Sequence, residues 1–355
     1  MQTHSHHALR LVTSLAAVWL LSSVPAAWAK DAPEPVTVDA TFNAADMAGK
    51  LTQVTEAATL KGITRVAVPQ FSVQFVTFDT ATAETSGFAA AGRARVTSSY
   101  VLKGVAEPDF QALTEALYTQ FLQGLKASGL EVLPFAQVAA APSYPKLVAT
   151  GVMAPVREDS NIVVAPAGMA LYGTNRAVAT APKKNAGVFG AFSGMGSVMS
   201  AIGSIGDVQA LARELGDAAL LEVHMVVNFV ELTNNNKGFL GRLSNTASVD
   251  AKTSPSIASA TMGVQAGAMR GTVTLAAPLA LDAAAFTEVR EQAKSTGQKA
   301  GMVAAQLLSI AIGSKDNSSY STKEAVADPA RYREVVGSGL GQVGQMFTAR
   351  LKAER

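Results

Sequence analysis

Cysteine is missing from the 355-residue chain, and histidine and tryptophan are scarce, with four and two copies. Without cysteine the chain has no disulfide, no thiolate metal ligand, no cysteine nucleophile and no lipid-modified N-terminal cysteine. Three histidines and both tryptophans lie within residues 1–29, so residues 30–355 keep only His224. A single histidine excludes any site with two imidazole ligands, and a Ser-His-Asp triad would have to use it. The composition therefore argues against most common catalytic chemistry.

Catalytic motifs are also missing. The chain contains no G-x-S-x-G elbow, and we expect no Walker, Rossmann or zincin motif. A hydrolase that uses only carboxylates remains open, because scattered Asp and Glu side chains form no motif. We assign no catalytic residue and expect no metal and no cofactor.

An excess of charge of either sign is absent as well. Residues 30–355 hold 28 Lys and Arg against 27 Asp and Glu, a net charge of +1. Nucleic-acid binding relies on clustered basic side chains that neutralise phosphates. We therefore expect no nucleic-acid partner.

The N-terminus has the three-part pattern of a secretory signal peptide. Arg10 precedes an apolar run over 11–21, and the small residues of Ala27-Trp28-Ala29 end the segment. The apolar run is too short to cross a bilayer as a helix, which needs about 20 residues. We expect cleavage after Ala29 and a soluble, secreted protein of the bacterial cell envelope, in the periplasm. The alternative is an uncleaved N-terminal anchor.

The pattern of strands and helices predicts a layered α/β (or α+β) sheet with flanking helices. We divide the chain into a signal peptide (1–29), an N-terminal segment (30–62), an α/β domain (63–312) with an irregular insertion at 141–206, and a loop with a C-terminal helix (313–355).

Individual elements follow from hydrophobic periodicity. Strands are expected at 63–78 and 94–102, joined by a connection at 79–92 into a long hairpin insertion. Further expected elements are a helix from Glu107 to Gly129, strands at 130–133, 162–165, 169–172, 218–232, 247–250, 256–265 and 271–281, a helix from Asp207 to Leu215, helices at 283–294 and 298–312, a polar loop at 313–327, and a last helix capped by Asp328. Glycines at 337, 341 and 344 let this last helix pack closely inside the chain or at a dimer seam.

His224 lies in the expected strand 218–232. Alternation places Glu222, His224 and Asn228 on the less apolar face of that strand. The histidine is either a partly exposed residue of a sheet face or part of a polar cluster, with Glu222 and Asn228, that lines a ligand-binding cleft. The second interpretation would make the protein respond to pH near neutrality.

The segment 186–206 holds 21 residues with no charge and seven glycines. Its large apolar side chains include Phe189, Phe192, Met195, Met199 and Ile202. Three interpretations remain open: a buried loop, a surface that contacts another subunit, or an element that inserts into a membrane.

Several stretches resemble a known group of envelope proteins. Val66 to Phe71 reads Val-Ala-Val-Pro-Gln-Phe, Ala127-Ser-Gly-Leu-Glu-Val-Leu133 returns from helix to strand, and Leu211-Ala-Arg-Glu-Leu-Gly-Asp-Ala-Ala-Leu220 runs from helix into strand. The pattern, over 63–140 and 207–281, is similar to the α/β fold of the curli secretion-channel protein, the lipoprotein activators of penicillin-binding proteins, and the N-terminal domain of the Tol translocation protein.

The resemblance implies a non-enzymatic envelope protein that docks to partners or assembles into oligomers. This chain departs from the group because it has no cysteine to acylate and because 72–103 and 141–206 have no counterpart there. No functional residue is carried over. The hypotheses are therefore a docking or self-assembling module whose partners are envelope proteins or further copies, an oligomer that inserts into a membrane through 186–206, and a small-ligand-binding protein or hydrolase with a cleft near His224.

Overall fold

The structure is a computed structural model that describes residues 33–86, 93–173, 205–235, 248–292 and 317–355. The chain forms two compact units, Met1–Glu34 and Pro35–Arg355, and every helix and strand described here belongs to the second unit. The expected signal peptide (1–29), the apolar helix at 298–312 and nearly all of the segment 186–206 lie outside the described residues.

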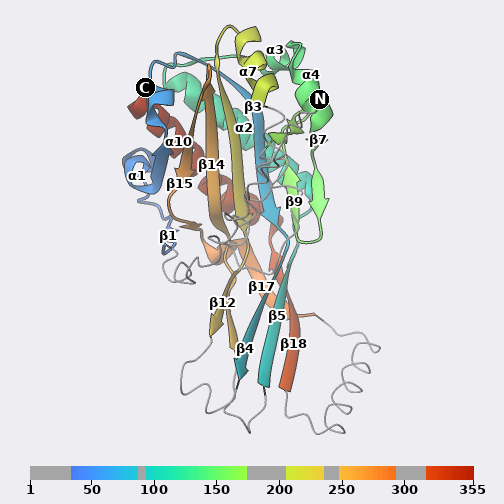
Figure 1. Cartoon of the computed structure of the whole chain (residues 1–355). Coiled ribbons are helices and arrows are strands. Elements are labelled where there is room, and N and C mark those ends of the chain that lie inside the picture. The colour runs from blue at the N-terminus through green and yellow to red at the C-terminus, as the bar shows by residue number, and fades with distance from the viewer. Residues whose placement is uncertain (1–32, 87–92, 174–204, 236–247, 293–316) are drawn as a thin grey trace, which may run out of the picture. The chain divides into compact units, whose positions relative to one another are not determined.

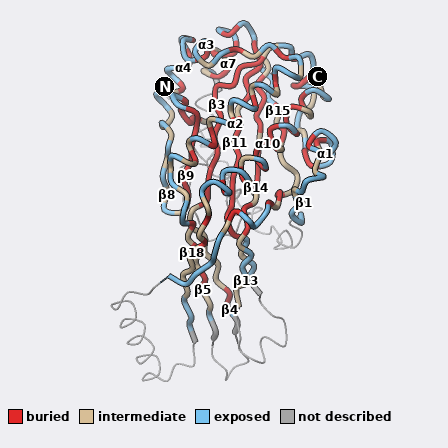
Figure 2. Tube along the Cα trace, turned by 180° about the vertical axis from the view of Figure 1, so that it is seen from behind, coloured by how far each residue is buried: buried red, intermediate tan, exposed pale blue. Residues whose placement is uncertain are grey.

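A ten-stranded mixed sheet forms the centre of the second unit (Figure 1). Its strands are β1 (Val36–Thr37), β2 (Thr52–Thr55), β3 (Arg65–Val76), β6 (Glu131–Val132), β8 (Val156–Glu158), β9 (Asn161–Val164), β11 (Ala219–Asn228), β14 (Ser256–Ala266), β15 (Met269–Leu275) and β16 (Leu279–Ala280). β11 is central: it pairs in parallel with β3 and antiparallel with β14. Both β3 and β11 are buried along most of their length (Figure 2).

Two long helices, α2 (Glu107–Ala127) and α10 (Pro329–Glu354), cover one face of this sheet. The Asp109 carboxylate accepts a hydrogen bond from the Ala106 backbone N–H (3.0 Å), and the Asp328 carboxylate accepts one from the Arg331 N–H (2.8 Å). These acceptors satisfy backbone N–H groups that a helix start leaves without partners. The expected helix from Glu107 and the expected cap at Asp328 are therefore confirmed.

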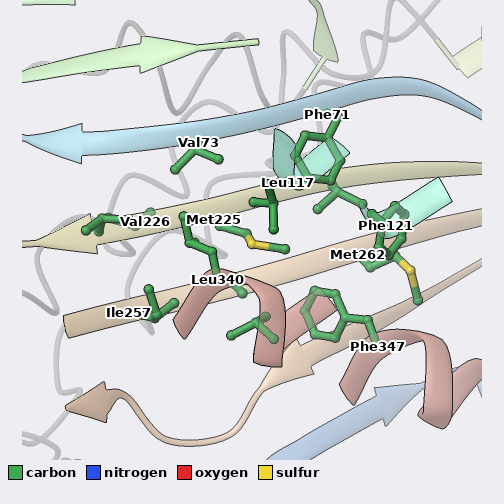
Figure 3. Close-up of a cluster of buried hydrophobic side chains, with 14 of the residues drawn as sticks. Phe71, Val73, Leu117, Phe121, Met225, Val226, Ile257, Met262, Leu340 and Phe347 are labelled. Carbon is green, nitrogen blue, oxygen red and sulfur yellow. The ribbon is translucent and has the colours of Figure 1, made fainter. Parts of the chain in front are cut away.

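The main hydrophobic core lies between these helices and the sheet (Figure 3). The sheet contributes alternate side chains such as Phe71, Val73, Met225 and Met262, and the helices contribute Leu117, Phe121, Leu340 and Phe347. Burying such side chains stabilises the fold by about 1.5–3 kcal/mol each.

A smaller core lies on the opposite face of the sheet, near one end of β3 and β11. The helices α3 (Phe135–Ala140), α4 (Tyr144–Thr150) and α7 (Ile205–Glu214) pack there against Ala67 and Leu220. The Glu214 carboxylate accepts hydrogen bonds from the Ser143 hydroxyl (2.7 Å) and the Ser143 backbone N–H (2.8 Å), which joins α7 to α4. Asp207 lies in the first turn of α7, which begins two residues earlier than expected.

A second sheet has four strands in the order β17-β18-β5-β4. These are β4 (Phe78–Ser86), β5 (Arg93–Lys103), β17 (Phe286–Glu291) and β18 (Asn317–Ala327). Two short sheets pair β7 (Val152–Met153) with β10 (Ala170–Leu171) and β12 (Glu231–Asn235) with β13 (Ser248–Lys252), and short 3-10 helices occupy Ala57–Leu60 and Ala283–Ala285. The N-terminal helix α1 spans Ala44–Leu51.

The mixed α/β class with flanking helices, a long hairpin and a C-terminal helix is confirmed. The first strand of the hairpin is 78–86 rather than 63–78, because β3 pairs inside the ten-stranded sheet while β4 pairs with β5. The expected strand 218–232 is split, since β11 ends at Asn228 and β12 belongs to another sheet.

Two expectations near the C-terminus are wrong. The expected helix at 283–294 is a 3-10 turn followed by β17, and the expected polar loop at 313–327 contains β18. The two strands pair with each other, and β18 pairs with β5 in parallel over ten residue pairs. Pairing with strands distant in sequence therefore overrides the local helix propensity of an Ala- and Glu-rich segment.

Three of the four glycines of α10 face side chains of the same chain. A Cβ at Gly341 would lie 3.0 Å from Gln120 of α2, and one at Gly344 would lie 3.6 Å from Phe121. Gly337 faces open space. Two of the three predicted glycines therefore face α2 of the same chain.

Candidate functional site

The candidate site is built on β11, whose side chains alternate as expected. Val223, Met225 and Val227 are fully buried in the main core. Glu222 and His224 keep part of their surface exposed on the other face, because successive side chains of a strand point to opposite sides. The alternation deduced from the sequence is therefore confirmed from Glu222 to Met225, whereas Val226 and Asn228, which follow on the face of His224, are buried as well.

The neighbouring strands extend this face with further polar side chains. On β3, Gln70 pairs with Glu222 and Ser72 pairs with His224, while on β14 Thr261 pairs with His224. We call this surface the polar sheet face; its residues are Gln70, Ser72, Gln74, Glu222, His224, Ser259, Thr261, Gln265 and Arg270. The polar sheet face lies on the same side of the sheet as the smaller core and follows it along β3 and β11.

His224 is held in place by a buried serine. Its Nδ1 lies 2.9 Å from the Ser72 hydroxyl oxygen, and that serine is fully buried. The Ser72 hydroxyl also donates to the Val223 carbonyl at 3.4 Å. The protein atoms packed around the ring lower the pKa of His224 from 6.5 to about 4, since burial disfavours the charged imidazolium. The imidazole is therefore neutral at pH 7.

Glu222 forms an ion pair with Arg270 from β15, with Oε2 and the guanidinium nitrogen 3.1 Å apart. The Glu222 side chain is only 12% exposed. Burial raises the pKa of Glu222, and the charge of Arg270 partly opposes that rise. Gly263 lies beside the pair, where a Cβ would be 3.7 Å from the carboxylate.

Asn228 shares the face but lies apart from the other two predicted residues. It is four positions beyond His224, which corresponds to about 13 Å along a strand. It pairs with Ser256 near the end of β14 and is 4% exposed. The structure therefore brings Glu222 and His224 together and separates Asn228 from them.

Sequence reasoning missed several residues of this face. Gln70 is 1% exposed and donates from Nε2 to the carbonyl oxygen of Tyr172 at 3.1 Å. Gln74 is 3% exposed, and its buried Oε1 has no hydrogen-bond partner among the described residues. The signal was the alternation of Phe71, Val73 and Phe75 with polar residues, which marks a polar face on β3 as well as on β11.

The site offers little reactive chemistry. The Ser72 hydroxyl lies within hydrogen-bond distance of both His224 Nδ1 and the Val223 carbonyl, and Ser72 is fully buried, so its hydroxyl is not accessible as a nucleophile. No group of three or more His, Asp or Glu side chains that could hold a metal occurs in the described part of the chain. The arrangement fits binding by hydrogen bonds.

The expectation that the chain has no Rossmann motif needs one correction at the level of spacing. Residues 339–344 have the G-x-G-x-x-G spacing of dinucleotide-binding loops. In the structure they lie inside α10, where Gly339 and Gly341 pack against neighbouring side chains. The motif therefore forms no phosphate-binding loop here.

The predicted interaction residues Phe189, Phe192, Met195, Met199 and Ile202 lie outside the described residues. The described part of the chain has no helix that is both long enough and apolar enough to cross a membrane.

The four-stranded sheet provides a second candidate surface. On one of its faces, hydroxyl groups pair across β4 and β5, with Thr80 bonded to Ser99 at 3.1 Å and Thr82 to Thr97 at 3.0 Å. On the opposite face Ala83 is fully buried, and the β12–β13 hairpin contacts β4 and β5. On the first face Arg95 forms an ion pair with Glu84 at 3.1 Å.

β17 forms one edge of this sheet and is exposed from residue 287 to 291. Val289 is 46% exposed, and Tyr320 on the adjacent β18 is 50% exposed. Arg290 contacts Glu324 of β18 at 2.9 Å and Glu288 at 3.2 Å. Because these ion pairs are exposed to solvent, they contribute little to stability.

Comparison with known proteins gives no match: no family model, no curated protein and no solved structure is significantly similar to the chain. The resemblance to the curli, lipoprotein-activator and Tol group therefore stays a prediction.

Proposed function

We propose that this chain is a non-enzymatic, soluble module of the bacterial periplasm that acts by docking to an envelope partner or by self-assembly. The contact surface of this proposal is the β17 edge of the four-stranded sheet, where no further strand pairs among the described residues. The export pattern at residues 1–29 supports the location.

The observation that carries the proposal is the edge strand β17. An edge strand presents a row of backbone N–H and C=O groups that another strand can pair with. β17 exposes five consecutive residues, and the apolar Val289 side chain lies among them. The charged residues of β17 are Glu288, Arg290 and Glu291. They disfavour pairing with a purely apolar strand and favour a strand that carries complementary charges.

The test compares two substitutions of equally exposed apolar residues. Val289→Lys places a charge on the β17 edge, and Met269→Lys does the same at the start of β15, where the side chain is 53% exposed. Light scattering after size-exclusion chromatography measures self-assembly, and an envelope pull-down measures docking. We expect Val289→Lys to abolish association and Met269→Lys to preserve it.

A strict monomer that captures no envelope partner would contradict the proposal. Equal loss of association in both variants would remove β17 as the contact surface.

A further inference from the structure

The strand β17 has backbone groups that face away from its neighbour β18. The Gln292 N–H donates to the Thr322 carbonyl of β18 at 2.9 Å, so the backbone groups of Gln292 point toward β18. In an antiparallel pair the direction of these groups alternates from one residue to the next, and the β17–β18 register is regular from Glu288 to Glu291. The N–H and C=O groups of Val289 and Glu291 therefore point to the side of β17 where no further strand pairs among the described residues.

The charges at the middle of β17 are arranged symmetrically about Val289. Glu288 and Arg290 lie on the same face of the strand, and their side chains contact each other at 3.2 Å. Both side chains are more than half exposed, at 53% and 57%. The side chain of Val289 points to the opposite face and is 46% exposed. The strand thus carries one charge of each sign on either side of an apolar residue.

This arrangement is complementary to itself. When two identical strands pair antiparallel about a twofold axis, each residue lies opposite the residue equally far on the other side of the centre. With Val289 at the centre, Glu288 of each copy lies opposite Arg290 of the other copy. The two Val289 residues form the hydrogen-bonded pair, since their backbone groups face outward. The charged residues then form non-hydrogen-bonded pairs, in which side chains approach each other more closely.

Other registers lack this complementarity. A centre at Glu288, Arg290 or Glu291 would place that residue opposite its own copy, and like charges directly opposite each other are destabilising. Parallel pairing in register would oppose like charges at every charged position. A centre at Thr287 aligns no opposite charges and falls on the irregularity at the start of β17. Among the centres from Thr287 to Glu291, the charge pattern therefore favours Val289.

We propose that the occupant of the β17 edge is β17 of a second copy of this chain, paired antiparallel about Val289. Glu291 then lies opposite the neutral Thr287, so no like charges face each other in the ladder. The pairing joins the two four-stranded sheets into one continuous sheet, and it closes at two copies because both copies use the same surface. This inference rests on the proposed function and names its partner.

Charge reversal tests the register. Glu288→Arg and Arg290→Glu each place like charges opposite one another in both halves of the symmetric pair. Opposite charges return when both substitutions are combined in one chain, and also when the two single variants are mixed. Glu84→Arg is the matched control, because Glu84 is 63% exposed and also forms an ion pair, with Arg95, but lies on β4 at the other edge of the same sheet.

Light scattering after size-exclusion chromatography, over a series of concentrations of the full chain, measures the dimer Kd. We expect the unaltered chain to form a dimer whose Kd rises at least about tenfold in each single variant. The double variant and the equimolar mixture should recover the dimer, and the Kd of Glu84→Arg should stay within about twofold of the unaltered value. Circular dichroism establishes whether each variant folds. If Arg290→Glu does not fold beside Glu324, Arg290→Gln replaces it in the mixture, because it too removes the repulsion from Glu288→Arg.

Failure of both the double variant and the mixture to recover the dimer would overturn the proposal. So would a dimer that Glu288→Arg leaves unchanged, or one that Glu84→Arg weakens equally. A monomer that captures an envelope partner, and loses it in Val289→Lys, would overturn the second copy as occupant and leave the proposed function standing. A monomer that captures no partner would contradict both.

Discussion

Acidification should destabilise the protein through His224. The pKa of His224 is about 4 in the folded state, against 6.5 for an ordinary histidine. Between these values the unfolded chain binds the proton and the folded chain does not, so stability falls as pH decreases through 6.5 toward 4. The histidine contribution to the free energy of unfolding is thus fully present above pH 6.5. Its loss amounts to about 2 kcal/mol at pH 5 and approaches about 3 kcal/mol below pH 4.

Two structural features affect the size of this predicted loss of stability. His224 keeps part of its residue surface exposed, so the figures are an upper bound. Glu222 acts with the opposite sign, because a raised carboxyl pKa makes the folded state bind a proton more tightly than the unfolded state. The stability associated with Glu222 therefore falls as pH rises through its titration range, and Glu222→Gln removes that contribution.

The assay is direct because His224 is the only histidine of residues 30–355. In that portion of the chain, one imidazole Hε1 resonance reports its titration by NMR. In the Glu222→Gln protein, urea unfolding should give a lower free energy of unfolding at pH 5 than at pH 7.5. Adding His224→Gln to that protein should abolish most of the difference between the two pH values. An Hε1 midpoint between 6 and 7 would show a solvated imidazole and refute the burial argument.

Three further predictions concern packing and membranes. Gly339→Ala should destabilise the fold by about 1–3 kcal/mol, because its Cβ would lie 2.5 Å from Leu281. Gly337→Ala should stabilise α10 by up to about 1 kcal/mol, because nothing lies within 4 Å of the added Cβ. Thermal denaturation of the two variants measures the difference. Phe75→Ala should cost about 3–5 kcal/mol in chemical denaturation, because Phe75 is fully buried. The membrane hypothesis predicts that the chain floats with liposomes and that deletion of 186–206 abolishes flotation; failure of the undeleted chain to float would end it.

The strands that the sequence predicted well are those with one apolar face. In β3 and β11, buried apolar residues alternate with polar ones, so the period of two is strong. The amphipathic helix α2 was equally clear, because its buried residues recur every three or four positions.

The longest strands that it missed lie in the four-stranded sheet. β18 and β4 are rich in Ser, Thr and Ala and are mostly half-exposed, so neither has an apolar face that periodicity would detect. β18 is fixed by parallel pairing with β5, more than 200 residues earlier in the chain. Such pairing depends on the assembled backbone, which local patterns do not encode.

The sequence predicted only part of the candidate site, because local patterns do not show how strands pair. Alternation on β11 identified Glu222 and His224, but only the register between β11 and β3 shows that Ser72 and Gln74 lie beside them. Asn228 was grouped with them because alternation identifies a face and gives no distance along it.

Hydrogen–deuterium exchange on the assembled protein tests the association proposal most directly. Backbone amides of β17, Phe286–Glu291, should exchange more slowly in the assembled or partner-bound protein than in the isolated monomer. Amides of the exposed turn at 267–268, near the control residue Met269, should be unchanged. Equal exchange of β17 in both states would contradict the account.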